Sequence, residues 1–297
     1  MPCYQPEEDC IVVRSGGDIA TGVIQKLWRS GFCVAVLETA APLTIRRSVA
    51  LSSAVREGVW RVEDMRALLV RSADDCRAAW ASGDIPVLVD PAMQSLAVLR
   101  PAVLVDAIIA KRNTGMRPDL APVTIALGPG FTAPDDVDCV VETKRGDSLG
   151  LLITRGTALP NIGAQGLLAD RIVRAPVAGR VRHVRSIGDR VAQGETLFFL
   201  DETPVPAPLG GTLRGLIAEG LSIRKGLKCA DVDPRSAEEV RWQNISDKAR
   251  CLGGAVLEAC FAIARQKGVP LQPDVPVKAE KEPFSHCVRA RSASPVQ

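Results

Sequence analysis

The stretch CIVVRSGGDIATGVIQKLWRSGFCVAVLE, residues 10–38, decides the fold. Residues 10–14 and 34–38 are short, nearly continuous apolar runs, which is typical of strands that are buried on both faces of a sheet. Between them lies a glycine turn, and residues 19–30 then carry apolar side chains at helical spacing. This order of strand, turn, helix and strand predicts the repeating unit of a parallel sheet.

The same alternation continues to about residue 153. A second helix is predicted over residues 62–81, where apolar residues again recur at helical spacing. The pattern as a whole favours a Rossmann-like α/β domain with a parallel sheet, which we place at residues 1–165. The further apolar runs that predict its strands are residues 86–89, 102–106, 123–127 and 138–141.

Residues 174–233 contain an internal repeat, which is visible when the sequence is shifted against itself by 32 positions. Each copy reads as short strands separated by glycine-centred turns, and neither copy can bury its apolar face alone. We therefore expect the two copies to pair into one small all-β barrel or sandwich at residues 166–236. The matching positions are residues 175–179 with 207–211, Gly188 with Gly220, Gly194 with Gly226, and residues 200–201 with 232–233.

Residues 245–267 predict a last helix, because their apolar residues form one stripe at steps of three and four. Gly253 and Gly254 interrupt this stripe. They indicate either close packing of the helix backbone on another element or a break into two helices. We expect the segment 237–268 to pack on the first domain, and the proline-rich, charged tail at 269–297 to be disordered.

Composition excludes several classes of protein. Aromatic residues make up 4% of the chain, too few for the stacking platforms of single-strand nucleic-acid binders, and the net charge of +3 does not indicate a general polyanion binder. The first residues do not resemble a secretory signal, and no apolar run of about 20 residues occurs, so we expect a cytoplasmic protein without a membrane partner. None of the nine cysteines forms a C-x-x-C pair, and we expect no metal site.

The glycine turn after the first strand is a candidate nucleotide site. Ser15, Gly17 and Ala20 stand where the dinucleotide-binding fingerprint places its small residues. Glu38 closes the second strand, where a carboxylate that binds ribose is expected. Asp18 has two interpretations, because a carboxylate at this point repels a diphosphate. It is either a plain helix cap or a group that acts through a metal or a non-phosphate ligand.

Basic pairs and a glycine-rich turn follow the later strands. The carboxyl ends of parallel strands line one crevice, so this repeated placement predicts a small anionic ligand, although any single pair is more often solvated surface. Acids at the same strand ends can serve as acid, base or metal ligand, or simply cap turns. No nucleophile–base set can be assembled, so catalytic residues stay unknown and enzymatic activity is left open. The candidate cofactor-binding residues are Ser15, Gly16, Gly17, Asp18, Glu38, Arg46, Arg47, Asp106, Lys111, Arg112, Gly128, Gly130, Glu142, Lys144 and Arg145.

A set of short motifs, in order between residues 10 and 265, resembles the YqeB family of selenium-dependent molybdenum hydroxylase accessory proteins. The resemblance implies a protein that helps to mature molybdenum hydroxylases of the xanthine dehydrogenase type. It further implies a first domain similar to that of XdhC-type chaperones, molybdopterin cytosine dinucleotide or another nucleotide as cofactor, and an apo molybdenum hydroxylase as partner. The motifs are RSGGDIATG (14–22), IRR (45–47), SAV (53–55), VDA (105–107), AKRN (110–113), LGPGFTA (127–133), VETKRG (141–146), SDKA (246–249) and GGAVLEA (253–259).

The chain departs from this family at three places. Ser15 replaces the first glycine of the family's R-G-G-G-D run, which narrows the ligand turn. Asp147 stands where the family often has histidine, so no role for that imidazole is carried over. Residues 134–135, a Pro-Asp pair, replace a glycine-containing loop.

The repeat is similar in pattern to biotinyl and lipoyl carriers, which are barrel-sandwich hybrids. Carriers present a lysine on the hairpin between the two copies, but residues 201–206 contain none. We therefore expect neither biotin nor lipoate, and a docking or structural role for this domain. Two alternatives to the accessory protein stay open: an NAD(P)-binding oxidoreductase and a non-catalytic scaffold. The sequence also leaves homo-oligomer formation open.

Overall fold

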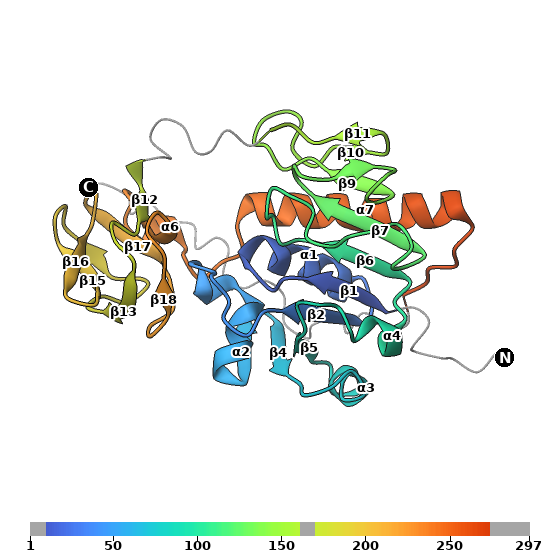
Figure 1. Ribbon diagram of the computed structural model, residues 1–297, viewed down its shortest axis with the longest axis horizontal. Helices are drawn as coiled ribbons and strands as arrows, with labels where there is room; N and C mark the ends of the chain where they lie inside the picture. Colours follow the sequence, from blue (N-terminus) through green and yellow to red (C-terminus); the bar gives the residue numbers. More distant parts are fainter. Residues whose placement is uncertain (1–9, 161–169, 274–297) are drawn as a thin grey trace, which may run out of the picture.

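The computed structural model describes residues 10–160 and 170–273. The chain forms a larger part of mixed α/β structure and a smaller all-β part beside it (Figure 1). The larger part contains a nine-stranded sheet, and the smaller part contains two separate four-stranded antiparallel sheets. The mixed α/β class predicted from the sequence is confirmed.

The nine-stranded sheet has the order β10-β9-β7-β6-β1-β2-β5-β4-β3. All strands from β9 to β4 in this order pair in parallel, and only the two edge strands, β10 and β3, pair antiparallel. The six apolar runs predicted as buried strands are all present. Their bounds are β1 (Ile11–Arg14), β2 (Val34–Glu38), β5 (Ile85–Val89), β6 (Val103–Asp106), β7 (Val123–Leu127) and β9 (Cys139–Val141).

The helix predicted over residues 62–81 is wrong. This segment instead contains the end of β3 (Val59–Val62), all of β4 (Met65–Leu69) and the short helix α3 (Cys76–Ala81). A tight turn joins the two strands, and Glu63 adopts a left-handed φ of 53° there. Because β4 also pairs with β5 in the sheet, strand pairing outweighs the helical spacing of the apolar residues.

Helices α1 (Asp18–Arg29) and α7 (Asp247–Lys267) cross at close range on one face of the sheet (Figure 1). A Cβ at Gly22 would lie 2.5 Å from the carbonyl oxygen of Ala249, and a Cβ at Gly253 would collide with the carbonyl oxygen of Gly22. Helix α7 is continuous, so Gly253 serves close backbone packing and does not break the helix. At Gly254 an added Cβ would meet nothing within 4 Å.

Short elements complete the larger part. They are the helices α2 (Ala54–Glu57) and α4 (Leu96–Leu99), the 3-10 turns η1 (Arg47–Val49) and η2 (Leu51–Ser53), and the strands β8 (Thr132–Ala133), β10 (Leu152–Ile153) and β11 (Gly156–Thr157). Helix α6 (Ala237–Val240) lies beside β17 of the all-β part (Figure 1). One hydrophobic cluster lies on each face of the main sheet, and a third fills the all-β part. No helix among the described residues is long and apolar enough to cross a bilayer.

The all-β part follows the sequence repeat strand by strand. The first copy contains β12 (Ile172–Arg174), β13 (Gly179–His183), β14 (Arg190–Val191) and β15 (Thr196–Leu200). The second contains β16 (Thr203–Pro206), β17 (Gly211–Leu216), β18 (Ser222–Ile223) and β19 (Lys228–Asp233). The sheet orders are β12-β19-β17-β14 and β16-β15-β13-β18, so each sheet takes two strands from each copy. If each strand is replaced by its equivalent in the other copy, the strand order of one sheet becomes that of the other. This is the pairing of the two copies that the repeat predicts.

The two parts are joined through β17 and the segment before η1. The amide of Leu216 donates to the carbonyl oxygen of Ile45 at 2.7 Å, and Arg47 Nε donates to the carbonyl oxygen of Leu216 at 2.7 Å. This contact places the all-β part near the carboxyl ends of the parallel strands. The predicted domain boundary at 165 and the tail from residue 274 lie outside the described residues.

Candidate functional site

The strand order reverses at β1, so the crevice expected for a ligand lies between the carboxyl ends of β1 and β6. Arg14 and Asp106 end these two strands and form an ion pair of 2.6 Å, with both side chains buried. Arg14 also donates to the carbonyl oxygen of Thr114, and Asp106 accepts the amide of Ile108. Burial raises the pKa of Asp106, and Arg14 opposes that rise. The pair therefore occupies the centre of the predicted crevice.

The glycine turn is closed by the protein's own side chains. Glu38 accepts the amide of Gly16 at 2.9 Å with one carboxylate oxygen and the amide of Thr39 at 2.8 Å with the other. Ser15 Oγ accepts the amide of Gly17 at 3.0 Å. The two amides that the sequence offers to a phosphate are thus engaged within the chain, and the acid expected to bind ribose holds one of them. Ser15 adopts a left-handed φ of 88°, which favours the glycine found there in the YqeB family.

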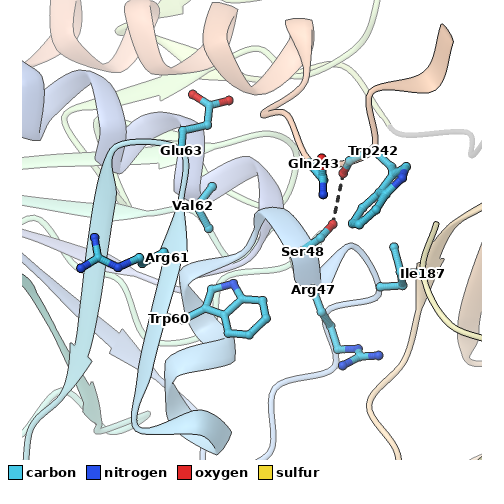
Figure 2. Close-up of a pocket in the computed structure, with 9 residues that line it drawn as sticks. All are labelled: Arg47, Ser48, Trp60, Arg61, Val62, Glu63, Ile187, Trp242 and Gln243. Atoms are coloured by element: carbon cyan, nitrogen blue, oxygen red, sulfur yellow. Dashed lines mark hydrogen bonds between the residues drawn. The ribbon is translucent and has the colours of Figure 1, made fainter. Parts of the chain in front are cut away.

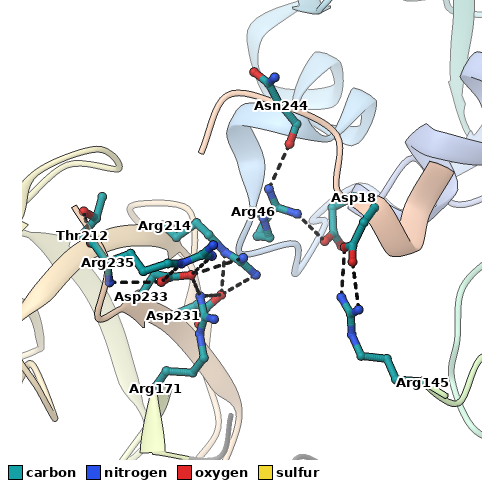
Figure 3. Close-up of polar contacts among 11 residues, drawn as sticks. Asp18, Arg46, Arg145, Arg171, Thr212, Arg214, Asp231, Asp233, Arg235 and Asn244 are labelled. Carbon is teal, nitrogen blue, oxygen red and sulfur yellow. Dashed lines mark hydrogen bonds and ion pairs between the residues drawn. The ribbon is translucent and has the colours of Figure 1, made fainter. Parts of the chain in front are cut away.

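Asp18 is not the cap of α1, because the N-cap residue is Gly17 and no side chain caps this helix. Its carboxylate instead lies 3.6 Å from Arg46, and the Asp18 side chain stays 32% exposed. Arg46 is buried and donates to the carbonyl oxygen of Asn244 at 3.2 Å. Its Nε atom is buried without a hydrogen-bond partner in the described part of the chain. Arg46 therefore lies between the two parts of the molecule and retains an unused donor (Figure 3).

Two lysines that the sequence analysis did not select lie near Asp18. Burial lowers the pKa of Lys228, at the start of β19, and Asp231 and then Asp18 counteract that shift. Burial also lowers the pKa of Lys248, in the first turn of α7, and Asp18 counteracts it. Within residues 10–160 and 170–273 neither ammonium group has an ion-pair partner. The sequence did contain a signal for Lys248, because this residue lies in the SDKA motif. Lys228 carries no motif, because only the pairing of the repeat copies brings it here.

The loops after β6, β7 and β9 converge at the same edge. A Cβ at Gly130 would lie 2.5 Å from the backbone of both Lys111 and Arg112, and a Cβ at Gly128 would lie 2.7 Å from Thr143 Oγ1. The side chains of Lys111, Arg112 and Lys144 are exposed. The structure therefore brings the turn at residues 128–130 against the pair Lys111–Arg112 and against Thr143, which precedes Lys144.

Two other predicted residues form bonds elsewhere. Arg145 makes two hydrogen bonds, of 3.0 and 3.1 Å, to Asp247 at the start of α7. Arg47 Nε donates to the carbonyl oxygen of Leu216 in the all-β part.

Glu142 is also engaged by the backbone. It is 2% exposed and accepts the amides of Thr143, Lys144 and Leu159 at 2.6 to 2.7 Å. The carboxylate therefore ties the start of the loop after β9 to the segment after β11. Both oxygens of the Glu142 carboxylate are engaged by backbone amides, so Glu142 stabilises this loop and leaves no free oxygen for a ligand.

The all-β part turns a charged surface toward this edge (Figure 3). Arg171, Arg214 and Arg235 surround the buried carboxylates of Asp231 and Asp233, with Arg171 Nε 2.6 Å from Asp231 and Arg235 2.8 Å from Asp233. Burial raises the pKa of Asp233, but the hydrogen bonds from Arg235 and Arg171 outweigh it and hold that pKa well below its ordinary value. Three cations against two carboxylates leave this network positive.

The site as a whole can bind an anion but shows no machinery for acid–base chemistry. Its strand-end carboxylates are bonded to amides or to Arg14, and burial raises the pKa of the Cys139 thiol to about 11. In the part of the chain that the structure describes, no group of three or more His, Cys, Asp or Glu side chains could hold a metal ion.

Comparison with known proteins gives one strong match. No protein-family model matches the chain. The chain is 43% identical to "Uncharacterized protein YqeB" of Escherichia coli (strain K12) over 269 residues, which are 89% of this chain and 50% of that protein. The chain therefore spans about half the length of this curated relative. The match supports the resemblance to the YqeB family.

Solved structures give only weak similarities. A succinylglutamate desuccinylase/aspartoacylase from Rhodobacter sphaeroides has 12% identity and a TM-score of 0.25, with 76% of this chain and 85% of that chain covered. An aspartoacylase family protein from Mesorhizobium loti has 12% identity and a TM-score of 0.23 with the same coverage. The ectoine utilization protein EutE (DoeB) from Ruegeria pomeroyi has 14% identity and a TM-score of 0.23, covering 75% and 84%. These scores are too low to carry an argument about fold or activity.

Proposed function

We propose, from the similarity to YqeB, that this chain is an accessory protein for the maturation of selenium-dependent molybdenum hydroxylases of the xanthine dehydrogenase type. It binds an anionic nucleotide cofactor, such as molybdopterin cytosine dinucleotide, at the carboxyl edge of the parallel sheet, and it presents that cofactor to an apo-enzyme in the cytoplasm. One observation carries the binding part of this proposal. Lys228 and Lys248 are partly buried cations near Asp18, and neither has a carboxylate in ion-pair contact among the described residues.

The fold supports this assignment. A parallel sheet whose order reverses at β1, with a glycine turn and α1 after β1, agrees with the Rossmann-like, XdhC-type domain that the resemblance implies. Two sheets that exchange strands between repeat copies have the layout of a barrel-sandwich hybrid. The hairpin at residues 201–206 lacks lysine, so the all-β part supplies Lys228 and the arginine network instead of a swinging arm.

The diphosphate of a dinucleotide matches the cations at this edge. Lys228 approaches from the all-β part and Lys248 from α7, and the buried Nε of Arg46 offers a third donor. Burial of an ammonium group without a partner is costly, and a bound phosphate removes that cost. The edge therefore becomes more stable when an anion is present.

A scaffold that binds no cofactor is the second candidate, and a specific observation favours it. Arg14 and Asp106 fill the crevice between β1 and β6, while Glu38 and Ser15 occupy the two glycine amides. The same bond at Glu38 argues against the NAD(P)-linked oxidoreductase, because that carboxylate is the group expected to bind the ribose. The two candidates that stand differ in one property, the binding of an anion.

Calorimetry with molybdopterin cytosine dinucleotide, NAD and ATP separates them. We expect the pterin dinucleotide to bind and NAD and ATP to bind far more weakly. Lys228→Met should weaken binding of the pterin about tenfold, because a charge-assisted contact is lost. Lys225→Met is the matched control, since Lys225 is exposed on the neighbouring turn and should change nothing. Absence of binding by all three ligands would support the scaffold.

The maturation step needs a test in cells. A host that lacks this protein and expresses a xanthine dehydrogenase-type enzyme should accumulate enzyme with little molybdenum. The wild-type chain should restore the metal content, measured by elemental analysis of the purified enzyme. The Lys228→Met, Lys248→Met double variant should fail to restore it while remaining folded. Full molybdenum content without the chain would contradict the proposal.

A further inference from the structure

A separate cavity of about 450 Å³ lies between the β3–β4 hairpin and the all-β part (Figure 2). This volume is within the range of roughly 300 to 1,000 Å³ that is usual for small-molecule sites. Four segments distant in the sequence form it. They contribute Arg47 and Ser48, residues 60–63, Ile187, and Trp242 with Gln243.

Two tryptophans face this cavity, one from β3 and one from the segment before α7. Trp242 is held in place, because Ser48 Oγ donates to its carbonyl oxygen at 3.1 Å and its ring packs where a side chain at Gly188 would stand. Trp60 packs partly against the core, yet its indole Nε1 is buried without a hydrogen-bond partner among the described residues. Buried indole N–H groups usually have a partner, so this donor is available to a ligand.

The charges around the cavity are positive. Arg47 uses Nε for its bond to Leu216, and Arg61 is exposed. Over residues 10–160 and 170–273 neither guanidinium group has a carboxylate within ion-pair distance. Aromatic faces combined with such guanidinium groups suit a flat, negatively charged ligand.

The acid in the lining does not cancel this charge. Glu63 accepts Gln25 Nε2 at 2.8 Å, the amide of Ile245 at 2.9 Å and Arg250 at 2.5 Å. Its carboxylate points away from Trp60 toward α7 (Figure 2). Burial raises the pKa of Glu63, but these hydrogen bonds outweigh it and keep the group ionised and neutralised by Arg250.

We propose that this cavity is a second binding site, for a planar aromatic ring that carries an anionic group, as in a nucleoside monophosphate. The ring lies against Trp60 and Trp242, and a ring acceptor takes the N–H of Trp60. The anion lies against Arg47, whereas the Arg61 side chain points to the other side of β3, away from Trp60 (Figure 2). This inference goes beyond the proposed function, because the cavity shares none of its lining with Lys228, Lys248 or the glycine turn.

Quenching of tryptophan fluorescence by CMP and AMP tests the proposal on the full chain. Inorganic phosphate and the uncharged nucleosides cytidine and adenosine serve as ligand controls and should bind at least about tenfold more weakly. Pterin-6-carboxylate, a different ring with one charge, shows whether the ring type matters. Saturable binding of an aromatic anion supports the site, and no binding of any aromatic anion overturns it.

Variants locate the ligand. Trp60→Leu and Arg47→Gln should each weaken binding about tenfold. Arg47 also bonds to the carbonyl oxygen of Leu216, so circular dichroism checks that Arg47→Gln stays folded. Trp60→Phe keeps a stacking face and should bind within about threefold of wild type. Arg71→Gln, an exposed arginine outside the cavity, is the matched control and should bind as wild type does. Unchanged binding in both Trp60→Leu and Arg47→Gln overturns the proposal.

Lys228→Met distinguishes this site from the proposed cofactor site. Nucleotide binding that survives in Lys228→Met and is lost in Trp60→Leu supports the cavity. Nucleotide binding that is lost in Lys228→Met, with or without loss in Trp60→Leu, overturns a separate site and leaves the proposed cofactor site standing.

Discussion

At the carboxyl edge of the parallel sheet, the carboxylates of Glu38, Asp106 and Glu142 all accept bonds from the protein itself. The cavity beside β3 is different, because Trp60 Nε1 has no partner in the described structure and Arg61 makes no ion pair there. The edge has the sequence signals of a ligand site but most of its polar groups are engaged. The cavity has no motif, but the indole N–H of Trp60 is left without a partner among the described residues.

This difference shows that acids at strand ends can be present to stabilise the edge of the sheet as well as to bind a ligand. Each acid fixes a turn or a neighbouring strand. Lys228 and Lys248, which form no ion pair among the described residues, come from outside this sheet. Binding at the edge therefore depends on how the all-β part and α7 are placed against it. The following predictions test how much the contacts at the edge contribute to stability, compared with those at the cavity.

The largest effect is expected at Asp106. Asp106→Ala leaves the buried guanidinium of Arg14 without its partner, and this should lower the free energy of unfolding by about 3 to 5 kcal/mol. Arg61→Gln at the exposed rim of the cavity should change it by less than about 0.5 kcal/mol. Urea denaturation followed by circular dichroism measures both. A loss below about 1 kcal/mol in Asp106→Ala would show that the pair does not fix the edge.

A second contrast lies within the glycine turn. A Cβ at Gly16 would lie 2.6 Å from the backbone nitrogen of Ser52, so Gly16→Ala should cost about 1 to 3 kcal/mol. A Cβ at Gly17 would lie 3.3 Å from the rotatable Ser15 Oγ, so Gly17→Ala should cost less than about 1 kcal/mol. Thermal denaturation of the pair checks this, and equal costs would contradict the packing described for η2.

Ser15 gives a smaller effect. Ser15→Gly relieves the left-handed backbone, whereas Ser15→Ala keeps it, and both lose the bond to the amide of Gly17. The glycine variant should therefore be more stable than the alanine variant by about 1 kcal/mol. Differential scanning calorimetry can resolve this difference. The opposite order would mean that Ser15 does not carry backbone strain.

The smallest effect is expected at the exposed pair of Arg145 and Asp247. The hydrogen bond from Arg145 lowers the pKa of Asp247 from 3.8 to about 2. Because the folded-state pKa is depressed, the stabilisation is present above pH 3.8 and is lost as the pH falls toward about 2. Carboxyl NMR should show this titration in the wild type and a return toward 3.8 in Arg145→Gln. An unchanged pKa of Asp247 in Arg145→Gln would show that the contact between the loop after β9 and α7 does not form.

The sheet was predictable because its strands are buried on both faces and therefore read as apolar runs. The repeat was predictable because glycine and apolar positions keep their register over 32 residues, and these positions became equivalent strands in two sheets. The β3–β4 hairpin was missed because its pairing with β5, a contact between distant residues, decides its conformation.

The candidate site was predictable only in part. Sequence order placed Glu38, Asp106 and Glu142 at one edge, but it could not show that Gly16, Arg14 and Thr143 would take their carboxylates. The cavity could not be predicted at all, since its four segments meet through tertiary contacts, such as that of β17 with Ile45 and that of Ser48 with Trp242.

The most direct test of the cofactor site is native mass spectrometry of the protein purified from cells that make molybdenum cofactor. We expect the wild-type chain to retain a molecule with the mass of a molybdopterin dinucleotide or another nucleotide, and the Lys228→Met, Lys248→Met double variant to lose it. A wild-type protein that carries no such molecule, or a double variant that retains it equally, would contradict this account.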